Sequence, residues 1–91
     1  MSESVVFSSE RGGYNKEDVL KKVEAYTAVL VMLHDSNMSL MRLNAELERI
    51  RSMPLRRLKV GFISTGSGYS VKQTDDYLSQ MEDKINRFTY L

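Results

Sequence analysis

Three groups of residues in this sequence have types and spacing that suggest chemistry, and the first is a glycine-rich stretch. Residues 61–66 have the opening spacing of a phosphate-binding loop, with glycine at both ends. Ser67 and Gly68 follow where that loop requires a lysine and a hydroxyl residue. Without the lysine the phosphates lack their cationic contact, so we expect no nucleotide binding.

The second group comprises the one histidine and the paired carboxylates. His34 is followed directly by aspartate and serine. Neighbouring positions on a helix do not face one another, which excludes a Ser-His-Asp nucleophile at this place. The acidic pairs at 75–76 and 82–83 offer oxygen ligands, but adjacent carboxylates on a helix point apart, as on a solvated face. The sequence therefore predicts no enzyme, no cofactor and no metal site.

The third group is a concentration of positive charge around Pro54. Its members are Arg49, Arg51, Arg56, Arg57 and Lys59. Phosphate contacts need such charge, so this segment carries an alternative hypothesis of a module that binds nucleic acid or an anionic surface. The net charge of only +1 and the lack of a recognisable reading helix argue against nucleic acid. We expect these cations to pair with Glu46 and Glu48, or with the acidic second helix.

Length and composition indicate one small domain, residues 1–91, with 42% hydrophobic and 27% charged residues. A chain of this size buries only about 60% of its unfolded surface, so a second copy is expected to complete its core. The absence of cysteine excludes disulfides and thiol catalysis. The longest apolar run, residues 28–33, is too short to span a membrane, and no signal peptide is evident, so we expect a cytoplasmic protein.

Two short segments have the composition of strands. Residues 4–9 and 58–64 are rich in β-branched and aromatic residues, and each runs into a glycine-containing turn. One isolated strand does not persist, so the two segments are expected to pair as a small ribbon.

Cap signals and the spacing of proline and glycine define two helices. Asn15 caps a helix that begins near Lys16, and no proline or glycine occurs from there to residue 52. We predict one continuous helix over 16–52, about 55 Å long at 1.5 Å per residue. Residues 34–39 are poor helix formers, so a break into two helices is the alternative. Ser70 and Gln73 form a capping box for a second helix that runs to about the C-terminus.

Apolar residues on the first helix follow a heptad pattern, which predicts self-association as a dimer or tetramer. The predicted self-association seam contains Val23, Tyr26, Leu30, Leu33, Asn37, Leu40, Asn44 and Leu47. The two asparagines would fix the register of a coiled coil at a cost in stability. The apolar face is wider than a strict seam, because it also includes Val29, Met32, Leu43 and Ile50. This leaves open that the helix packs on the chain's own second helix, or forms a four-helix assembly.

A shift of 55 residues superimposes the first part of the chain on the last. Identical residues coincide at Val5 and Val60, Phe7 and Phe62, Ser9 and Ser64, Gly13 and Gly68, and Tyr14 and Tyr69. The chain thus repeats a strand, a Gly-Tyr turn and a helix, which predicts a mainly α fold with two short β-strands in the order β-α-β-α. We interpret both glycines as residues with positive φ in tight turns, and both tyrosines as packing against the helix starts.

At these residues the sequence resembles the DivIVA-like family of bacterial pole and septum scaffolds. The family's N-terminal module has a phenylalanine, a Gly-Tyr pair, a polar cap and a helix that enters a parallel coiled coil. The matching residues are Phe7, Gly13, Tyr14 and, in a second copy, Phe62, Gly68 and Tyr69. The two half-motifs span about residues 4–52 and 58–91. The resemblance implies a non-catalytic, self-associating scaffold or adaptor in bacterial cell division or envelope growth, which binds itself and an unidentified protein partner.

The chain departs from the best-known members of that family just before each Gly-Tyr pair. Those members carry an exposed aromatic and a basic residue there, which insert at the membrane surface. The matching positions here hold Arg11 and Gly12 in one copy and Gly66 and Ser67 in the other. A lone arginine contributes only about 1 kcal/mol near an anionic leaflet. We therefore expect weak membrane contact at most, at the inner face of the membrane.

Overall fold

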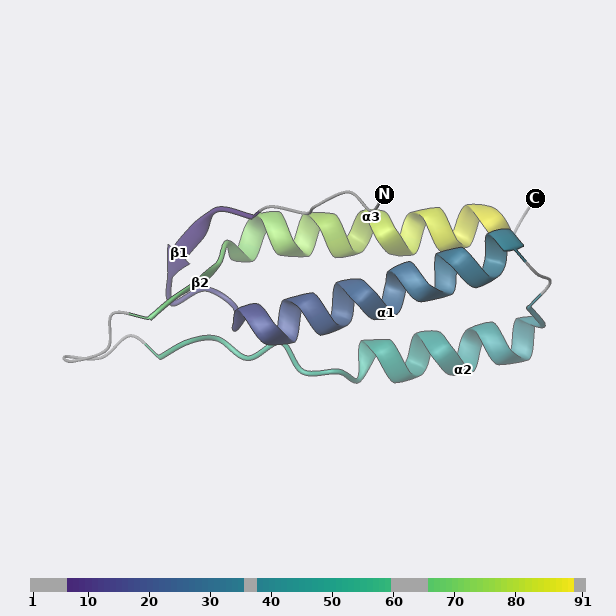
Figure 1. The fold of residues 1–91 in the computed structure, drawn as a ribbon, viewed down its shortest axis with the longest axis horizontal. Helices are drawn as coiled ribbons and strands as arrows, with labels where there is room; N and C mark the ends of the chain where they lie inside the picture. The colour runs from purple at the N-terminus through teal and green to yellow at the C-terminus, as the bar shows by residue number, and fades with distance from the viewer. Residues whose placement is uncertain (1–6, 36–37, 60–65, 90–91) are drawn as a thin grey trace.

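The computed structural model describes residues 7–35, 38–59 and 66–89 of the chain, which fold into three helices and one two-stranded antiparallel sheet (Figure 1). The elements are β1 (Ser9–Arg11), α1 (Lys16–Asp35), α2 (Leu40–Arg51), β2 (Ser67–Tyr69) and α3 (Val71–Thr89). The predicted mainly helical fold with two short strands is confirmed. The predicted β-α-β-α order is not what the structure has, because two helices separate the strands.

The predicted continuous helix over 16–52 is wrong, and the alternative break within 34–39 is what the structure has. α1 ends at Asp35, and Ser39 caps the start of α2. The Ser39 hydroxyl accepts a hydrogen bond from the backbone N–H of Arg42 at 3.1 Å. Serine is a favoured N-cap, and the polar residues of this stretch compete with the helical backbone bonds. The chain therefore reverses, and α2 runs antiparallel to α1 (Figure 1).

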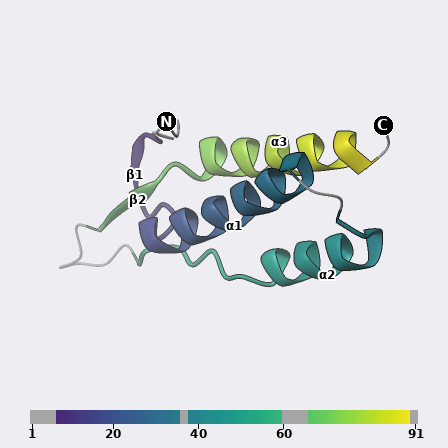
Figure 2. The ribbon, with the colours of Figure 1, turned by 45° about the vertical axis from the view of Figure 1, so that its right-hand side comes forward.

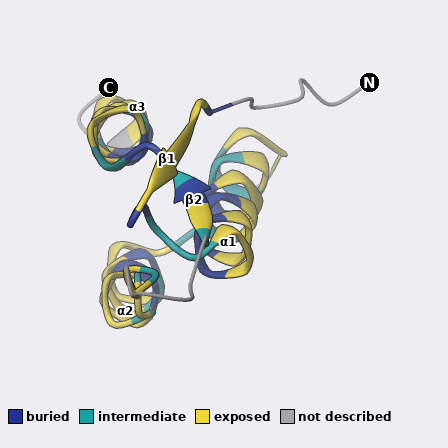
Figure 3. Cartoon of the chain, turned by 90° about the vertical axis from the view of Figure 1, so that its left-hand side faces the viewer, coloured by how far each residue is buried: buried dark blue, intermediate teal, exposed yellow. Residues whose placement is uncertain are grey.

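α1 is the central helix of the bundle. α3 lies along it in the same direction and α2 in the opposite direction, which Figures 1 and 2 show from two sides. Viewed from the left of Figure 1, the buried faces of the helices turn towards one another (Figure 3). The core residues are Phe7, Val19, Val23, Tyr26, Val29, Leu43, Leu47, Ile50, Leu78, Met81 and Ile85. The packing of α1 on the chain's own last helix is thus one of the alternatives that the heptad pattern left open.

The strands lie later in the sequence than predicted. Ser9, Glu10 and Arg11 pair with Tyr69, Gly68 and Ser67. Most of the predicted strand segments, residues 4–6 and 60–64, lie outside the described residues. The observed pairing falls in the stretches that we predicted to be turns, because glycine there permits the two backbones to approach closely.

The sheet end of the bundle is closed by aromatic side chains. The Phe7 ring lies 5.3 Å from the Tyr69 ring and 5.6 Å from the Tyr77 ring, measured between centroids. Phe7 is buried, and its contacts join the segment before β1 to β2 and α3. Among the described residues no helix combines the length and apolarity needed to cross a membrane.

Candidate functional site

The two Gly-Tyr pairs of the sequence repeat lie directly against each other. The backbone N–H of Tyr14 donates to the carbonyl oxygen of Tyr69 at 3.0 Å, and the N–H of Tyr69 donates to the carbonyl of Tyr14 at 2.9 Å. Each pair thus gives the other the same hydrogen bond that it receives. We call this contact the Gly-Tyr junction, and it consists of Gly13, Tyr14, Gly68 and Tyr69.

The helices that follow the junction also begin at equivalent positions of the repeat. Asn15 Oδ1 accepts from the backbone N–H of Asp18 at 3.0 Å, at the start of α1. Ser70 Oγ accepts from the backbone N–H of Gln73 at 3.3 Å, at the start of α3. The helix starts of the two copies thus coincide under the 55-residue shift, whereas the strands do not, because β1 spans Ser9–Arg11 and β2 spans Ser67–Tyr69.

The predicted reason for the junction glycines is wrong. Neither Gly13 nor Gly68 has a positive φ; among the described glycines that conformation belongs to Gly12, at 73°. A Cβ added to Gly13 would overlap the carbonyl oxygen of Tyr69, and one added to Gly68 would overlap that of Tyr14. Both positions need glycine because two backbones meet there with no room for a side chain.

The side chains beside the junction are held by polar contacts. The Tyr14 hydroxyl donates to Asp75 Oδ1 at 2.9 Å, and burial raises its pKa above the usual value, with a further rise from Asp75. The Lys16 ammonium lies 5.3 Å from the centroid of the Tyr69 ring. Phe62, the other aromatic residue of the predicted turn motif, lies outside the described residues. The junction therefore joins the two copies of the repeat through close backbone contact and reciprocal hydrogen bonds.

The arginines of the basic segment are engaged inside the chain. Arg49 Nη2 lies 3.0 Å from Glu46 Oε2. Arg51 Nη1 lies 3.9 Å from Glu48 Oε1, and its Nη2 lies 2.6 Å from Glu82 Oε1 on α3. These are the pairings with Glu46, Glu48 and the acidic last helix that we expected from the sequence. They leave less free charge for phosphate than the sequence pattern suggests.

Arg56 and Arg57 connect the segment after α2 to the start of α1. The Arg56 guanidinium donates to both carboxylate oxygens of Asp18 at 2.9 Å, and its backbone N–H donates to the same carboxylate at 3.1 Å. These hydrogen bonds lower the pKa of the Asp18 carboxyl to about 2. Arg57 Nε donates to the carbonyl oxygen of Gly12 at 2.5 Å, whereas Lys59 is exposed.

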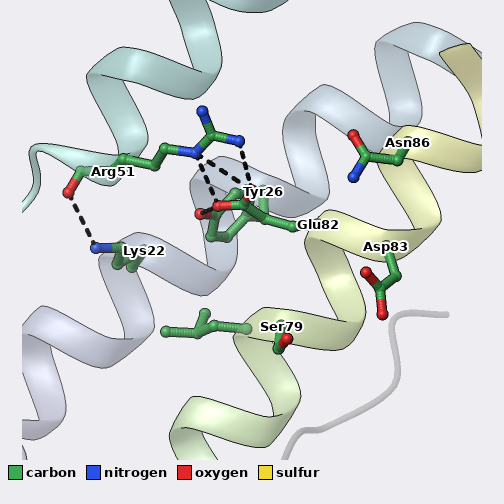
Figure 4. A pocket seen from close by; sticks show the side chains of 8 residues that line it. Lys22, Tyr26, Arg51, Ser79, Glu82, Asp83 and Asn86 are labelled. Atoms are coloured by element: carbon green, nitrogen blue, oxygen red, sulfur yellow. Dashed lines mark hydrogen bonds and ion pairs between the residues drawn. The ribbon is translucent and has the colours of Figure 1, made fainter.

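A pocket of about 380 Å³ lies between α2 and α3, over a polar cluster (Figure 4). The Tyr26 hydroxyl donates to Glu82 Oε2 at 2.5 Å, and the same carboxylate accepts from the Arg51 guanidinium. The Lys22 ammonium donates to the carbonyl oxygens of Met53 at 3.0 Å and Arg51 at 3.5 Å, near the end of α2. The cluster thus ties all three helices together.

The electrostatics of this cluster suit a structural role. Burial raises the pKa of Tyr26 well above its usual range, and the hydrogen bond to Glu82 adds to the rise. The hydrogen bonds from Arg51 lower the pKa of Glu82, and burial lowers that of Lys22. Tyr26 therefore stays protonated and Glu82 stays ionised near neutral pH. Sequence reasoning missed Lys22, although it falls in the apolar phase of α1 between Val19 and Tyr26. It identified Glu82 only as part of an acidic face that the basic segment could meet.

The residues of the predicted self-association seam do not share one exposed face. Val23, Tyr26 and Leu47 are buried within the single chain, and Leu30 and Leu33 are half-buried against its core. Leu40 and Asn44 are exposed, and Asn37 lies outside the described residues. The chain reverses between α1 and α2. The positions that one continuous helix would place along a single face therefore lie on two antiparallel helices.

Large apolar side chains gather at the end of the bundle opposite the sheet. Four are exposed there: Val31 by 52%, Leu40 by 60%, Met41 by 83% and Phe88 by 42%. The His34 and Phe88 rings lie 6.5 Å apart, which places the last turn of α1 beside that of α3. We call this end of the bundle, with Val31, Leu33, Leu40, Met41 and Phe88, the open end; the last turns of α1 and α3 and the first turn of α2 lie at the right of Figure 1.

The chain matches no protein-family model, no curated protein and no solved structure. Within the described ranges, no three histidine, aspartate or glutamate side chains gather closely enough to hold a metal ion. The open end, the Gly-Tyr junction and the polar cluster are the features of the described residues that could support a function.

Proposed function

We propose that this chain is a non-catalytic, self-associating scaffold or adaptor module, which forms a homo-dimer or tetramer and also binds an unidentified protein. The observation that carries the proposal is the open end, where four large apolar side chains are exposed. Large apolar side chains exposed at one end of a small protein favour an interaction site there, because each gains about 1.5–3 kcal/mol when it is fully buried.

The size of the chain supports the same proposal. A chain of 91 residues forms a small core, and part of its apolar surface stays outside that core at the open end. The net charge of +1 gives little repulsion between copies. A module that binds nucleic acid or an anionic surface through residues 49–59 has less support, because four of the five cations there have partners within the chain.

The proposed cellular role comes from the resemblance to DivIVA-like proteins. Its support is the Gly-Tyr repeat, whose two copies form the junction. The role is a cytoplasmic scaffold in bacterial cell division or envelope growth, with weak contact at the inner face of the membrane at most.

Molar mass in solution tests self-association. We expect size-exclusion chromatography with light scattering to give a dimer or tetramer at high protein concentration, with little change between low and physiological salt, because the contact is apolar. A monomer at every concentration contradicts the proposal. Binding to nucleic acid that weakens steeply as salt rises would instead favour the basic segment.

Localisation tests the cellular role separately. We expect a fluorescently tagged copy in a rod-shaped bacterium to gather at poles and septum. A tagged copy that oligomerises in solution but stays diffuse in the cell contradicts the division role and leaves an adaptor with another partner.

A further inference from the structure

We propose that the open end docks on the open end of a second copy, so that two bundles meet tip to tip about a two-fold axis and their cores join. This inference rests on the proposed self-association and adds which surface makes the contact. The sheet end takes no part, because aromatic side chains already close it.

The first support is that the core stripe of each helix continues beyond the buried core. On α3, Phe88 follows the fully buried Ile85 by one turn and is 42% exposed. On α2, Leu40 precedes the buried Leu43 by one turn and is 60% exposed. On α1, Leu33 follows the buried Val29 and is half-buried. Among the described residues, the stripes of α2 and α3 thus end in exposed apolar side chains, and a second open end supplies an apolar surface of the same character to cover them.

The second support is the charge at the helix ends that meet there. Asp35 ends α1, where a helix favours a cation, and its exposed carboxylate lies 3.1 Å from the ring of the neighbouring His34. Arg42 lies in the first turn of α2, where a helix favours an anion. Among the described acidic residues, none lies within ion-pair distance of the Arg42 guanidinium. In a two-fold dimer the same surface is used by both copies, so Arg42 of each copy can face Asp35 of the other. The surface is thus complementary to itself in charge as well as in apolar character.

The expected contact is small. A standard interface covers about 800 Å² on each partner, and five side chains with a charged rim provide less than that. We therefore expect a dissociation constant in the micromolar range, so that the dimer forms and separates within an accessible concentration series.

An apolar-to-charged substitution tests the surface. Met41→Glu changes a side chain that is 83% exposed, so the fold of the single chain should be retained, as checked by circular dichroism. We expect this variant to dimerise at least about tenfold more weakly than the unaltered chain. The matched control is Leu20→Glu, at a residue that is 43% exposed near the start of α1, and it should leave the dissociation constant unchanged. Equal weakening by both variants overturns the proposal.

A charge exchange tests the two-fold arrangement. Asp35→Arg and Arg42→Asp each place a favourable charge at a helix end, so neither should destabilise the chain. Alone, each variant brings like charges together across the axis and should be largely monomeric. Mixed in equal amounts, the two should form a heterodimer, because the introduced arginine then faces the introduced aspartate while the native pair is kept at the second contact. Failure of the mixture to associate, when both single variants are monomeric and folded, overturns the tip-to-tip geometry.

Two further outcomes separate this inference from the proposed function. A dimer that survives Met41→Glu leaves self-association standing but refutes the open end as its surface. A chain that is monomeric throughout, and that sediments with anionic phospholipid vesicles unless Met41 is replaced by Glu, would assign the open end to a lipid surface and refute both.

Discussion

Substitution of the junction glycines gives the sharpest test of how the two halves of the chain are joined. We expect Gly13→Ala and Gly68→Ala each to destabilise the fold, because the added methyl group would overlap a backbone carbonyl of the opposite Gly-Tyr pair. Backbone atoms cannot rotate away as a side chain does, so the two segments have to separate.

The expected cost follows from what that separation breaks. Two reciprocal hydrogen bonds between Tyr14 and Tyr69 are lengthened or lost, at about 0.5–1.5 kcal/mol each. Alanine lowers the entropy of the unfolded chain and recovers about 0.4–1 kcal/mol. With the remaining steric strain, each single substitution should lower the free energy of unfolding by about 2 kcal/mol. A domain of this length has about 5–14 kcal/mol in total, so the loss is readily measured.

The double variant carries the decisive information. Once the first methyl group has moved the segments apart, the second meets a gap that is already open. The double substitution should therefore cost less than the sum of the two, with a coupling of about 1 kcal/mol. The free energy of unfolding is measured for the unaltered chain, the two single variants and the double variant. The method is urea unfolding followed by circular dichroism, at one fixed protein concentration.

The control is Ser67→Ala, an exposed residue of β2, which should change the free energy of unfolding by less than about 0.5 kcal/mol. Strictly additive losses would mean that Gly13 and Gly68 are constrained independently. Neutral effects at both glycines would refute the close approach altogether.

Three further predictions concern the contacts that position the helices. Tyr26→Phe removes the hydroxyl that donates to Glu82, and it should lower the free energy of unfolding in urea by about 1.5 kcal/mol; an unchanged value would show that Arg51 alone satisfies the carboxylate. Ser39→Ala removes the N-cap of α2 and should cost about 1 kcal/mol, whereas Ser79→Ala, at an exposed helical position, should cost almost nothing. The Asp18 carboxyl has a pKa of about 2 in the folded chain against 3.8 for the free group, so its stabilisation is complete above that value and is lost as pH falls towards 2. The difference in unfolding free energy between the unaltered chain and Asp18→Asn should therefore shrink between pH 5 and pH 2, and a constant difference would contradict this linkage.

Local signals in the sequence predicted local structure well. α1 and α3 begin directly after Asn15 and Ser70, as the cap signals predict. This prediction succeeds because capping depends on neighbouring residues alone. The pairing of Arg49 with Glu46 and of Arg51 with Glu48 could also be predicted, since each glutamate lies one turn away on the same helix.

Features decided by distant parts of the chain were not predictable in the same way. Both a continuous helix and a break at 34–39 satisfy the heptad pattern, and the choice depends on whether α1 finds its partner within the chain. The role of Gly13 depends on the backbone of Tyr69, which no local pattern indicates. Lys22 was missed because a lysine among apolar positions gives no sign of the carbonyl oxygens of Arg51 and Met53 that receive it.

The Gly-Tyr junction has the form of a two-fold contact inside one chain. Each Gly-Tyr pair donates one backbone hydrogen bond to the other pair and accepts one from it, as the two copies in a symmetric dimer do. Because one chain carries both pairs, they meet at an effective concentration on the order of millimolar, whatever the concentration of the protein. Dilution should therefore leave this contact intact even where it separates copies of the chain from one another.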